Sequence, residues 1–483
     1  MAVPDKSDSR LRFRLIRKAA ILSQDPLSQD RDTIFALSSG RLPAAIAVIR
    51  ISGPQARQAL LATCGRVPEP RRATFARLRD PVSQETIDEA LVLWFARPGS
   101  ETGEDMVELQ VHGGRAIVAR VFAVLGQLAG FRMAEPGEFT RRAFENGRLD
   151  LTAVEGLADL INADTEAQRR QAFRQFKGVL GNRADTWRGR MIEAQALVEA
   201  GIDFSDEGDV PGDLAVRAIE IIRPLASEIR QAGAGQGERL REGLAVAIAG
   251  APNVGKSTLL NRLARRDAAI VSPHAGTTRD VIEVQLDLGG FPVILRDTAG
   301  LREATDPVEQ EGVRRAWSAV TEANLVLWVV DASRIEAGLS LAQQPTPGAD
   351  TEHWIILNKS DLLAPGAAEA LVSKLAERFG VNPLLTISAT SGAGIDDLVQ
   401  ALAGFAERFF TAEPALVTRE RHRVALREAG QALDDAVRLG PQGGEELVAE
   451  QIRLATRALE RLTGRIGVED ILDVIFRDFC IGK

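Results

Sequence analysis

Apolar residues change their spacing several times along the chain, and each change predicts a different kind of structure. In residues 32–150, short β-rich runs alternate with turns and are followed by an apolar helical pattern. The runs lie at 45–51, 90–95 and 107–111, and the helical pattern lies at 117–125. This mixture predicts a small α+β domain. From residue 151 the apolar positions follow a helical period over long stretches with few prolines, which predicts a helical segment.

A second change occurs near residue 244, where short continuous apolar runs alternate with helical patterns. The runs lie at 244–249, 293–296, 325–330, 354–357 and 384–387. Because strands of a parallel sheet are covered on both faces, continuous apolar runs of this length are typical of them. Residues 282–288 instead alternate apolar and polar positions, which predicts a strand at the edge of the sheet. After about residue 410 the helical spacing returns, through Val448, Ile452, Ala455, Leu459 and Leu462.

Helical sequence on both sides of an intact α/β unit predicts an insertion, because domains accept a whole guest where their ends meet at a surface loop. We therefore expect a multidomain α/β protein with an N-terminal α+β domain, a discontinuous all-helical domain and an inserted domain with a mostly parallel sheet. The expected limits are 31–147 for the first domain, 148–242 and 411–483 for the second, and 243–410 for the third, after a basic extension at 1–30.

Composition narrows the class of protein. Of 483 residues, 26% are charged and 45% are hydrophobic, which is typical of a globular protein in water, and no apolar run is long enough to cross a bilayer. The net charge of −8 means that a nucleic-acid partner must meet a local basic patch on an acidic body. The two cysteines, Cys64 and Cys480, are too few for a disulfide framework, so we expect a cytoplasmic protein.

Residues 1–30 interleave basic residues with apolar ones but lack a long apolar core and a small-residue cleavage site. A secretory signal is therefore not expected. Two interpretations stay open: a frayed basic tail, as an upstream start codon would give, and a transit-like or partner-binding helix.

The clearest chemical signal is a glycine-rich loop between a predicted strand and a predicted helix. Residues 250–257 read GAPNVGKS and match the P-loop pattern GxxxxGK[ST] in the required context. Its glycines let backbone N–H groups converge on a phosphate, Lys256 neutralises phosphate oxygens, and Ser257 can bind Mg²⁺. The nucleotide-binding residues predicted here are Asn253, Val254, Gly255, Lys256, Ser257 and Thr258.

Three further motifs follow predicted strands in order. Residues 297–300 read DTAG, in which the aspartate can hold the metal through water and a glycine amide can sense a γ-phosphate. Residues 358–361 read NKSD, and the aspartate can accept hydrogen bonds from N1–H and the 2-amino group of guanine, which adenine lacks. Ser388-Ala389-Thr390 would complete the base pocket. These motifs add to the predicted nucleotide site Asp297, Thr298, Ala299, Gly300, Asn358, Lys359, Asp361, Ser388 and Ala389.

Together the four elements closely resemble the GTPases related to translation factors, which implies a Ras-like GTPase domain. Residues 272–280 form a plausible switch loop, in which a threonine completes the Mg²⁺ shell when the γ-phosphate is present. Leu301 stands where Ras-like enzymes carry the glutamine that orients the attacking water. Catalysis therefore needs another positive charge, and a monovalent cation held by Asn253 and switch-loop carbonyls would supply it.

Several stretches of residues 32–483 resemble one family, the tRNA uridine-5-carboxymethylaminomethyl modification GTPases called MnmE or TrmE. These stretches lie at 32–34, 47–53, 102–105, 112–114, 136–140, 149–151 and 276–280, and the chain ends in Cys-Ile-Gly-Lys at 480–483. The resemblance implies a tetrahydrofolate-binding N-terminal domain that forms a homodimer, and a GTPase domain inserted into a helical domain.

The resemblance also implies an activity. It is K⁺-stimulated hydrolysis of GTP to GDP in a heterotetramer with an FAD-dependent subunit. The heterotetramer installs the carboxymethylaminomethyl group at C5 of the wobble uridine of certain tRNAs and uses a folate one-carbon unit. Carried over by position, the K⁺ ligands are Asn253, Ser272, His274 and Thr277, and the Mg²⁺ ligands are Ser257 and Thr278. Thr277, Thr278 and Ser272 thereby also belong to the nucleotide site. Glu309 would position the water, and Cys480 is a candidate thiol for the modification chemistry. The positions that match 5-formyltetrahydrofolate ligands are Arg50, Glu108, Arg148 and Lys483.

Alternatives remain for single residues and for the whole chain. Cys480 can instead pack beside Phe476 and Phe479, and Glu309 can be a solvated acid at a helix start. Four arginines are either a tRNA-binding surface or solvated helix faces, namely Arg141, Arg142, Arg169 and Arg170. A second function of a different class is a non-modifying switch, such as a ribosome-assembly GTPase; the N-terminal folate-like domain favours the tRNA-modifying enzyme.

Overall fold

The computed structural model describes the chain from residue 32 to 482 with internal gaps. The described residues are 32–203, 213–234, 237–266, 268–270, 283–298, 320–334, 351–379, 384–410, 416–441, 443–467, 469–477, 479 and 481–482. By its contacts the chain divides into two compact units, Met1–Val154 with Gly467–Lys483, and Glu155–Ile466. No helix within the described residues is long and apolar enough to cross a membrane.

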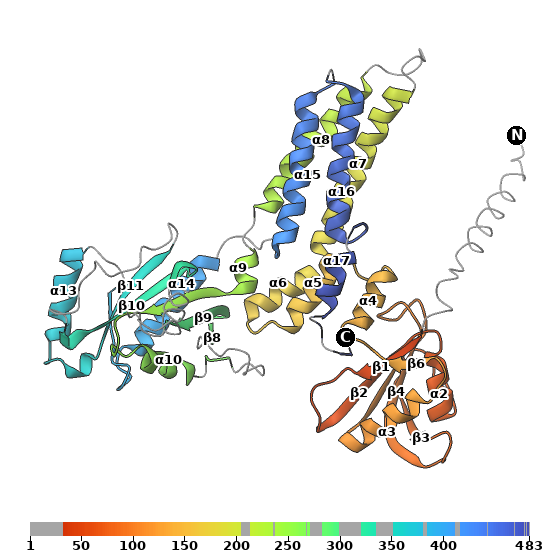
Figure 1. Ribbon diagram of the computed structural model, residues 1–483, viewed down its shortest axis with the longest axis horizontal. Coiled ribbons are helices and arrows are strands. Elements are labelled where there is room, and N and C mark those ends of the chain that lie inside the picture. The colour runs from red at the N-terminus through yellow and green to blue at the C-terminus, as the bar shows by residue number, and fades with distance from the viewer. Residues whose placement is uncertain are drawn as a thin grey trace, which may run out of the picture. The chain divides into compact units, whose positions relative to one another are not determined.

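The first unit is built on a mixed sheet (Figure 1). Among its described residues the strands follow the order β3-β4-β5-β2-β1-β6, in which β1 pairs antiparallel with β2 and parallel with β6. The strands are β1 (Thr33–Leu37), β2 (Ala44–Ser52), β3 (Thr74–Arg79), β4 (Thr86–Phe95), β5 (Met106–Gly113) and β6 (Phe131–Met133). The strands predicted at 45–51, 90–95 and 107–111 are thereby confirmed as parts of β2, β4 and β5.

Helices complete this unit from both ends of the chain. They are α2 (Ala56–Cys64), α3 (Arg115–Gly126), α4 (Glu138–Glu145) and α17 (Glu469–Arg477). The predicted helix at 117–125 is confirmed as α3, and it shares one apolar core with α2 and the sheet. The last residues of the chain join the same unit, because α17 contacts α4 and Ile481 forms a β-bridge with Pro136.

In the second unit, four long helices of the described part form a bundle. They are α7 (Val179–Asp203), α8 (Leu214–Gly233), α15 (Glu420–Leu439) and α16 (Glu445–Thr463), two before and two after the α/β region (Figure 1). The helix pairs in contact are α7 with α8, α8 with α15, α15 with α16, and α16 with α7. One core contains buried side chains from both halves, including Met191, Ile222, Leu433 and Ile452. The prediction of one helical domain split in the sequence is therefore confirmed.

The α/β region carries a sheet in the order β12-β11-β10-β7-β9-β8 among its described residues. Its strands are β7 (Leu244–Ala249), β8 (Glu283–Leu288), β9 (Phe291–Asp297), β10 (Leu325–Asp331), β11 (Glu352–Asn358) and β12 (Leu384–Thr386). All neighbouring strands are parallel except β8 and β9. Both predictions are confirmed: the continuous apolar runs form the parallel strands, and the alternating run forms the edge strand β8.

Helices cover both faces of this sheet. On one face α10 (Lys256–Ala264) and α14 (Ile395–Phe410) share a core with strand residues such as Ile356. On the other face α13 (Ala367–Phe379) packs Leu375 against Ile355 and Leu357. This division follows from the pleat, since neighbouring strand residues point to opposite faces.

Shorter helices lie at the junctions of the second unit. They are α5 (Leu151–Ile161), α6 (Glu166–Phe176) and α9 (Gly237–Glu242). A capping box starts α6, because the Thr165 hydroxyl accepts from the Gln168 backbone N–H and the Gln168 side chain accepts from the Thr165 backbone N–H. In the first turn of α6, the Ala167 backbone N–H donates to the Gly290 carbonyl at 3.0 Å, and Gly290 lies in the turn between β8 and β9.

A buried ionic cluster connects α5 with the start of α15. The Glu155 carboxylate, 1% exposed as a residue, accepts hydrogen bonds of 2.6 Å from two nitrogens of Arg421 and from His422 Nε2. Arg421 also donates to the Leu462 carbonyl at 2.9 Å, near the end of α16. Burial by itself raises the pKa of Glu155, but the hydrogen bonds and charges of His422 and Arg421 outweigh it and lower that pKa to about 2. Burial lowers the pKa of His422, although the hydrogen bond and the charge of Glu155 raise it.

Candidate functional site

The glycine-rich loop joins the end of β7 to the start of α10. Gly250 has φ of +144°, and a Cβ there would lie 2.3 Å from the Val329 carbonyl oxygen of β10. Gly255 has φ of +100° at the N-cap of α10, and a Cβ there would lie 2.3 Å from Asn358 Nδ2. Only glycine fits either position. The loop is therefore fixed against two neighbouring strands, and the N-terminus of α10 opens into it.

Lys256 extends back over this loop. Its Nζ donates to the carbonyl oxygens of Gly250 and Ala251 at 2.9 and 3.0 Å. The residue is 6% exposed, and burial lowers the pKa of the ammonium group while the charge of Asp297 raises it. An ammonium held by two loop carbonyls lies where an incoming phosphate can replace those contacts with stronger charge-assisted ones.

Ser257 and Asp297 meet at the metal position predicted from the sequence. Ser257 Oγ donates to Asp297 Oδ2 at 2.8 Å, although the two residues come from α10 and β9. Asp297 Oδ1 is buried and has no hydrogen-bond partner among the described residues. A hydroxyl and a carboxylate with a free oxygen are donors that Mg²⁺ prefers, so these two side chains fit that ion. Thr298 donates through Oγ1 to the Ile248 carbonyl at 2.8 Å and fixes the end of β9 beside β7.

Asn358 connects the phosphate loop with the predicted base loop. Its Nδ2 donates to the Val254 carbonyl at 2.7 Å, and its Oδ1 accepts from the Ala389 backbone N–H at 2.9 Å. All of these atoms are buried. The two ends of the predicted nucleotide site are thus joined through one side chain.

Lys359 and Asp361 follow at the end of β11. Lys359 has φ of +66° and pairs with Asp331 at 2.7 Å, a partner that the sequence did not reveal. Burial raises the pKa of Asp331, but Lys359 and Ser333 lower it below its usual range. Asp361 is exposed, and its carboxylate makes no hydrogen bond within the described part of the chain, so it is free to accept two hydrogen bonds from a base. Ser388 is fully buried and its backbone N–H donates to the Ala393 carbonyl at 2.9 Å.

Asn253 and Thr258 occupy the rim of the same site. Asn253 has φ of +64° and an exposed side chain whose amide makes no hydrogen bond with any described residue. An uncommitted amide oxygen beside the phosphate loop is a suitable ligand for K⁺. The remaining predicted residues lie outside the described residues, and these are Ser272, His274, Thr277, Thr278, Ala299, Gly300, Glu309, Cys480 and Lys483.

The predicted folate residues lie in the first unit. Arg50 on β2 stands opposite Glu108 on β5 in the strand register, and their side chains pair at 3.1 Å. Arg50 also pairs with Glu101 at 2.9 Å, and its buried Nε has no hydrogen-bond partner among the described residues. Its guanidinium lies 5.8 Å from the ring centroid of Phe139. The group therefore combines a carboxylate and a guanidinium, and a carboxylate can accept hydrogen bonds from the ring donors of a pterin.

Arg148 and the end of the chain border this group. Arg148 is exposed, and its Cγ would lie 3.3 Å from a Cβ on Gly103, two residues after Glu101. At the other side Ser38 Oγ donates to the Gly482 carbonyl at 2.7 Å. Gly482 has φ of +97°, and a Cβ there would lie 2.1 Å from the Leu37 carbonyl oxygen. Since β1 pairs with β2 beside Arg50, Gly482 brings the end of the chain to this edge of the group.

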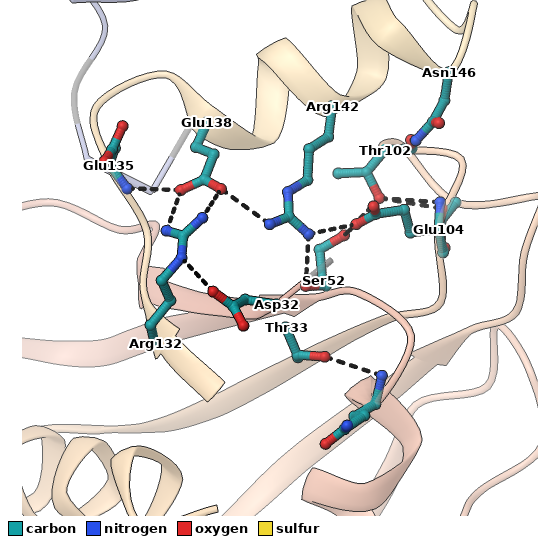
Figure 2. Close-up of polar contacts among 12 residues, drawn as sticks. Asp32, Thr33, Ser52, Thr102, Glu104, Arg132, Glu135, Glu138, Arg142 and Asn146 are labelled. Carbon is teal, nitrogen blue, oxygen red and sulfur yellow. Dashed lines mark hydrogen bonds and ion pairs between the residues drawn. The ribbon is translucent and has the colours of Figure 1, made fainter. Parts of the chain in front are cut away.

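A buried ionic network supports the loop that carries Glu101 (Figure 2). Arg142 on α4 is 4% exposed and donates to Glu104 at 3.0 Å and to Glu138 at 2.9 Å. Glu138 also binds Arg132, and burial, which raises its pKa, is outweighed by these arginines and by the Glu135 backbone N–H, so the pKa is lowered. Figure 2 also shows the Asn146 amide, which donates to the Thr102 carbonyl at 2.7 Å.

This network corrects one interpretation. Arg142 is buried between two carboxylates, so it does not belong to a surface that tRNA could reach. Arg141 next to it pairs with Asp473, and Arg169 and Arg170 pair with Glu166 on an exposed helix face. Sequence reasoning missed the supporting role of Arg142 because it treated two adjacent arginines as one surface.

Comparisons with known proteins agree with this arrangement. A model of the MnmE helical domain matches residues 151–480, and a model of the GTP-binding protein TrmE N-terminus matches residues 33–148. The tRNA modification GTPase MnmE of Bradyrhizobium sp. (strain ORS 278) is 56% identical over 457 residues, which cover 93% of this chain and 99% of that protein. The enzyme of the same name from Rhodopseudomonas palustris (strain BisB18) is 54% identical, covering 94% of this chain and 99% of that protein.

Solved structures match part of the chain. The G domain of the T. maritima FeoB iron transporter is 25% identical, with a TM-score of 0.27, and covers 34% of this chain and 98% of its own. The FeoB G-domain from Methanococcus jannaschii is 26% identical, with a TM-score of 0.25, and the match covers 34% of this chain and 96% of that domain. The ribosome-assembly alternative is not favoured, because the relatives that span nearly the whole chain are named as tRNA modification enzymes. The chain therefore belongs to the MnmE family of tRNA modification GTPases.

Proposed function

We propose that the chain hydrolyses GTP with the help of Mg²⁺ and K⁺ and couples this hydrolysis to folate-dependent modification of the wobble uridine of certain tRNAs. GTP hydrolysis in tRNA modification follows from the family. The folate, the two cations and the partner subunit are the parts that we add.

The nucleotide would lie along the loop at residues 250–257, with its base between Asp361 and the loop at 388–390. Lys256 binds the phosphates, and the free carboxylate of Asp361 reads the guanine edge. Mg²⁺ would be held by Ser257 and, in the switch loop, Thr278, next to the unpaired oxygen of Asp297. It supplies charge that neutralises the phosphate oxygens.

K⁺ would be held by Asn253 together with Ser272, His274 and Thr277, and it supplies positive charge at the phosphates in place of an arginine. Glu309 would orient the attacking water. The uncommitted amide of Asn253 supports this proposal.

The observation that carries the folate part is the Arg50–Glu108 pair beside the docked C-terminal segment. The pair offers a carboxylate to the ring donors of a pterin, and the unpartnered Nε of Arg50 is a further donor. Arg148, and Lys483 next to the docked Gly482, would bind the glutamate tail of 5-formyltetrahydrofolate. Cys480 is the thiol nearest in sequence to this group and the candidate for covalent chemistry.

The remaining expectations concern assembly and place. The chain would form a homodimer through its N-terminal domain and a heterotetramer with an FAD-dependent subunit in the cytoplasm. The homodimer follows from the family resemblance, as does the FAD-dependent subunit.

Two measurements test the cations and the folate separately. GTP hydrolysis is compared in KCl and in NaCl, and equal rates would refute the K⁺ proposal. Binding of 5-formyltetrahydrofolate is measured by calorimetry for Glu108→Gln and for the control Glu89→Gln, which removes an exposed pair with Arg77 on the same sheet. We expect Glu108→Gln to weaken folate binding by at least about tenfold and the control to leave it unchanged. Equal affinities would reassign the folate site.

The reaction itself is tested in cells. Mass spectrometry of tRNA nucleosides from a deletion strain should show wobble uridines without the carboxymethylaminomethyl group. Normal wobble uridines would contradict the proposed reaction.

A further inference from the structure

Arg262 lies in the last turn of α10, on the helix whose first turn carries Lys256 and Ser257. Its Nε donates to the Ala389 carbonyl at 2.6 Å, and its Nη2 donates to the Thr390 carbonyl. Both carbonyls belong to the predicted base loop, 127 and 128 residues further along the chain. The sequence motifs give no role to this arginine.

The base loop is shaped to receive this guanidinium. Gly392 has φ of +98°, and a Cβ there would lie 2.8 Å from Arg262 Nη1. The loop is also closed on itself, because the Gly392 backbone N–H donates to the Ser388 carbonyl at 2.8 Å. A loop with this internal closure moves as one piece, so its position depends on what anchors it to the rest of the domain.

Within the described part of the chain, two side chains from other elements bind the backbone of this loop, and they reach it from different elements. Asn358 at the end of β11 accepts from the Ala389 N–H, and Arg262 from α10 donates to the carbonyl of the same residue. Lys256 and Arg262 are separated along α10 by about 9 Å, at 1.5 Å of rise per residue. One helix thereby touches the phosphate position at its first turn and the base loop at its last.

We infer that Arg262 is a positioning residue for guanine recognition, which holds the loop at 388–390 in the conformation that receives the base. This inference rests on the proposed nucleotide site. Without the guanidinium, the loop would lose one of these two side-chain anchors and would populate the receptive conformation for a smaller fraction of the time. The apparent affinity for the nucleotide falls by that same fraction.

The test uses the full chain and two probes, GDP and inorganic pyrophosphate, by calorimetry in the presence of Mg²⁺. We expect Arg262→Ala to weaken GDP binding by about tenfold, which corresponds to about 1.4 kcal/mol, and to change pyrophosphate binding by less than about twofold. Arg262→Lys, which keeps the charge but loses the forked donor geometry, should fall between the wild type and Arg262→Ala.

A matched control lies just beyond the end of the same helix. Arg266 pairs with Asp396 of α14 and, among the described residues, donates to no carbonyl of the base loop, so Arg266→Ala removes a nearby arginine contact without loosening that loop. We expect Arg266→Ala to bind GDP within about twofold of the wild type. Far-UV circular dichroism confirms that each variant is folded.

Two results would overturn the inference. Unchanged GDP binding in Arg262→Ala means that the anchor is dispensable, and an equal loss for GDP and pyrophosphate means that the arginine supports the whole site rather than the base loop. Failure of the proposed nucleotide site looks different: the wild type itself would then not prefer GDP to ADP.

Discussion

The substitution Glu155→Gln in the buried cluster tests whether a buried carboxylate holds the helical part of the chain together. Glutamine has nearly the same shape, so the change removes the charge without opening a cavity. The glutamine keeps only one acceptor oxygen for Arg421 and His422. Its amide N–H₂ group then faces a donor, Arg421 or His422, in place of the second oxygen.

Two arguments give the size of the expected effect. The fall of the Glu155 pKa from its ordinary 4.5 to about 2 corresponds to roughly 3 kcal/mol of stabilisation of the folded chain. Removing one partner of a buried ion pair typically costs about 3–5 kcal/mol. Arg421 keeps some contact with solvent, with 21% of its side chain exposed, so we expect the lower end, about 3 kcal/mol.

Urea unfolding followed by far-UV circular dichroism at pH 7 measures this loss. The control is Glu166→Gln, because Arg169 and Arg170 lower the Glu166 pKa to about 2 as well, but on an exposed helix face. We expect no measurable change for the control, since solvent screens an exposed pair. Equal losses in the two variants, or a loss below about 1 kcal/mol in Glu155→Gln, would refute the reasoning from burial.

The pH dependence of the same cluster has a definite sign. The folded pKa of Glu155 is lowered, so its stabilisation is complete above pH 4.5 and is lost as the pH falls through about 2. At neutral pH the variant and the wild type should therefore differ most, and in strong acid they should converge.

The remaining predictions concern other sites. Burial lowers the pKa of His422, so below about pH 6.5 the unfolded chain binds a proton more readily than the folded chain does. The urea concentration at the unfolding midpoint should therefore decrease as the pH is lowered from 7.5 to 5.5. This decrease should be smaller in His422→Gln. Lys256→Ala should weaken GDP binding by at least about 100-fold in calorimetry with an unchanged melting temperature, and tight binding would mean that the phosphate site lies elsewhere. Gly482→Ala should weaken folate binding by at least about tenfold while GDP binding stays constant, because a Cβ at 2.1 Å from the Leu37 carbonyl displaces the tail; normal folate binding would show that the tail is not needed.

The sequence predicted the strands and the phosphate loop because their signals are local. A strand buried on both faces needs apolar side chains at successive positions. Residues 325–330 are apolar without interruption, as that environment requires. The loop at 250–257 needs glycines where the backbone of β10 and the side chain of Asn358 approach it, and those glycines, Gly250 and Gly255, are only five positions apart in the sequence. Each element carries within about ten residues the information that determines it.

Contacts over long sequence separations were not predictable in this way. Arg262 reaches a carbonyl 127 residues away, and Arg421 reaches a carboxylate 266 residues away. Arginine is common at exposed helix positions, so neither residue stands out from its neighbours in the sequence. Only the fold brings the acceptor to the donor: for Arg262 it is the order of strands in the sheet, and for Arg421 it is the packing of helices far apart in the chain.

Arg142 is an intermediate case, because the sequence did carry a usable signal. In a helix, residues three and four apart share a face, and successive residues point about 100° apart. Arg142 follows the buried Phe139 by three positions and Glu138 by four, so it faces inward with them, whereas Arg141 faces a different direction. An arginine on an apolar helix face requires acid partners, and Glu138 at the four-residue spacing is one of them. Assigning the two adjacent arginines by helix face, rather than by charge, would have placed Arg142 in the buried network with Glu138 and left only Arg141 for the surface.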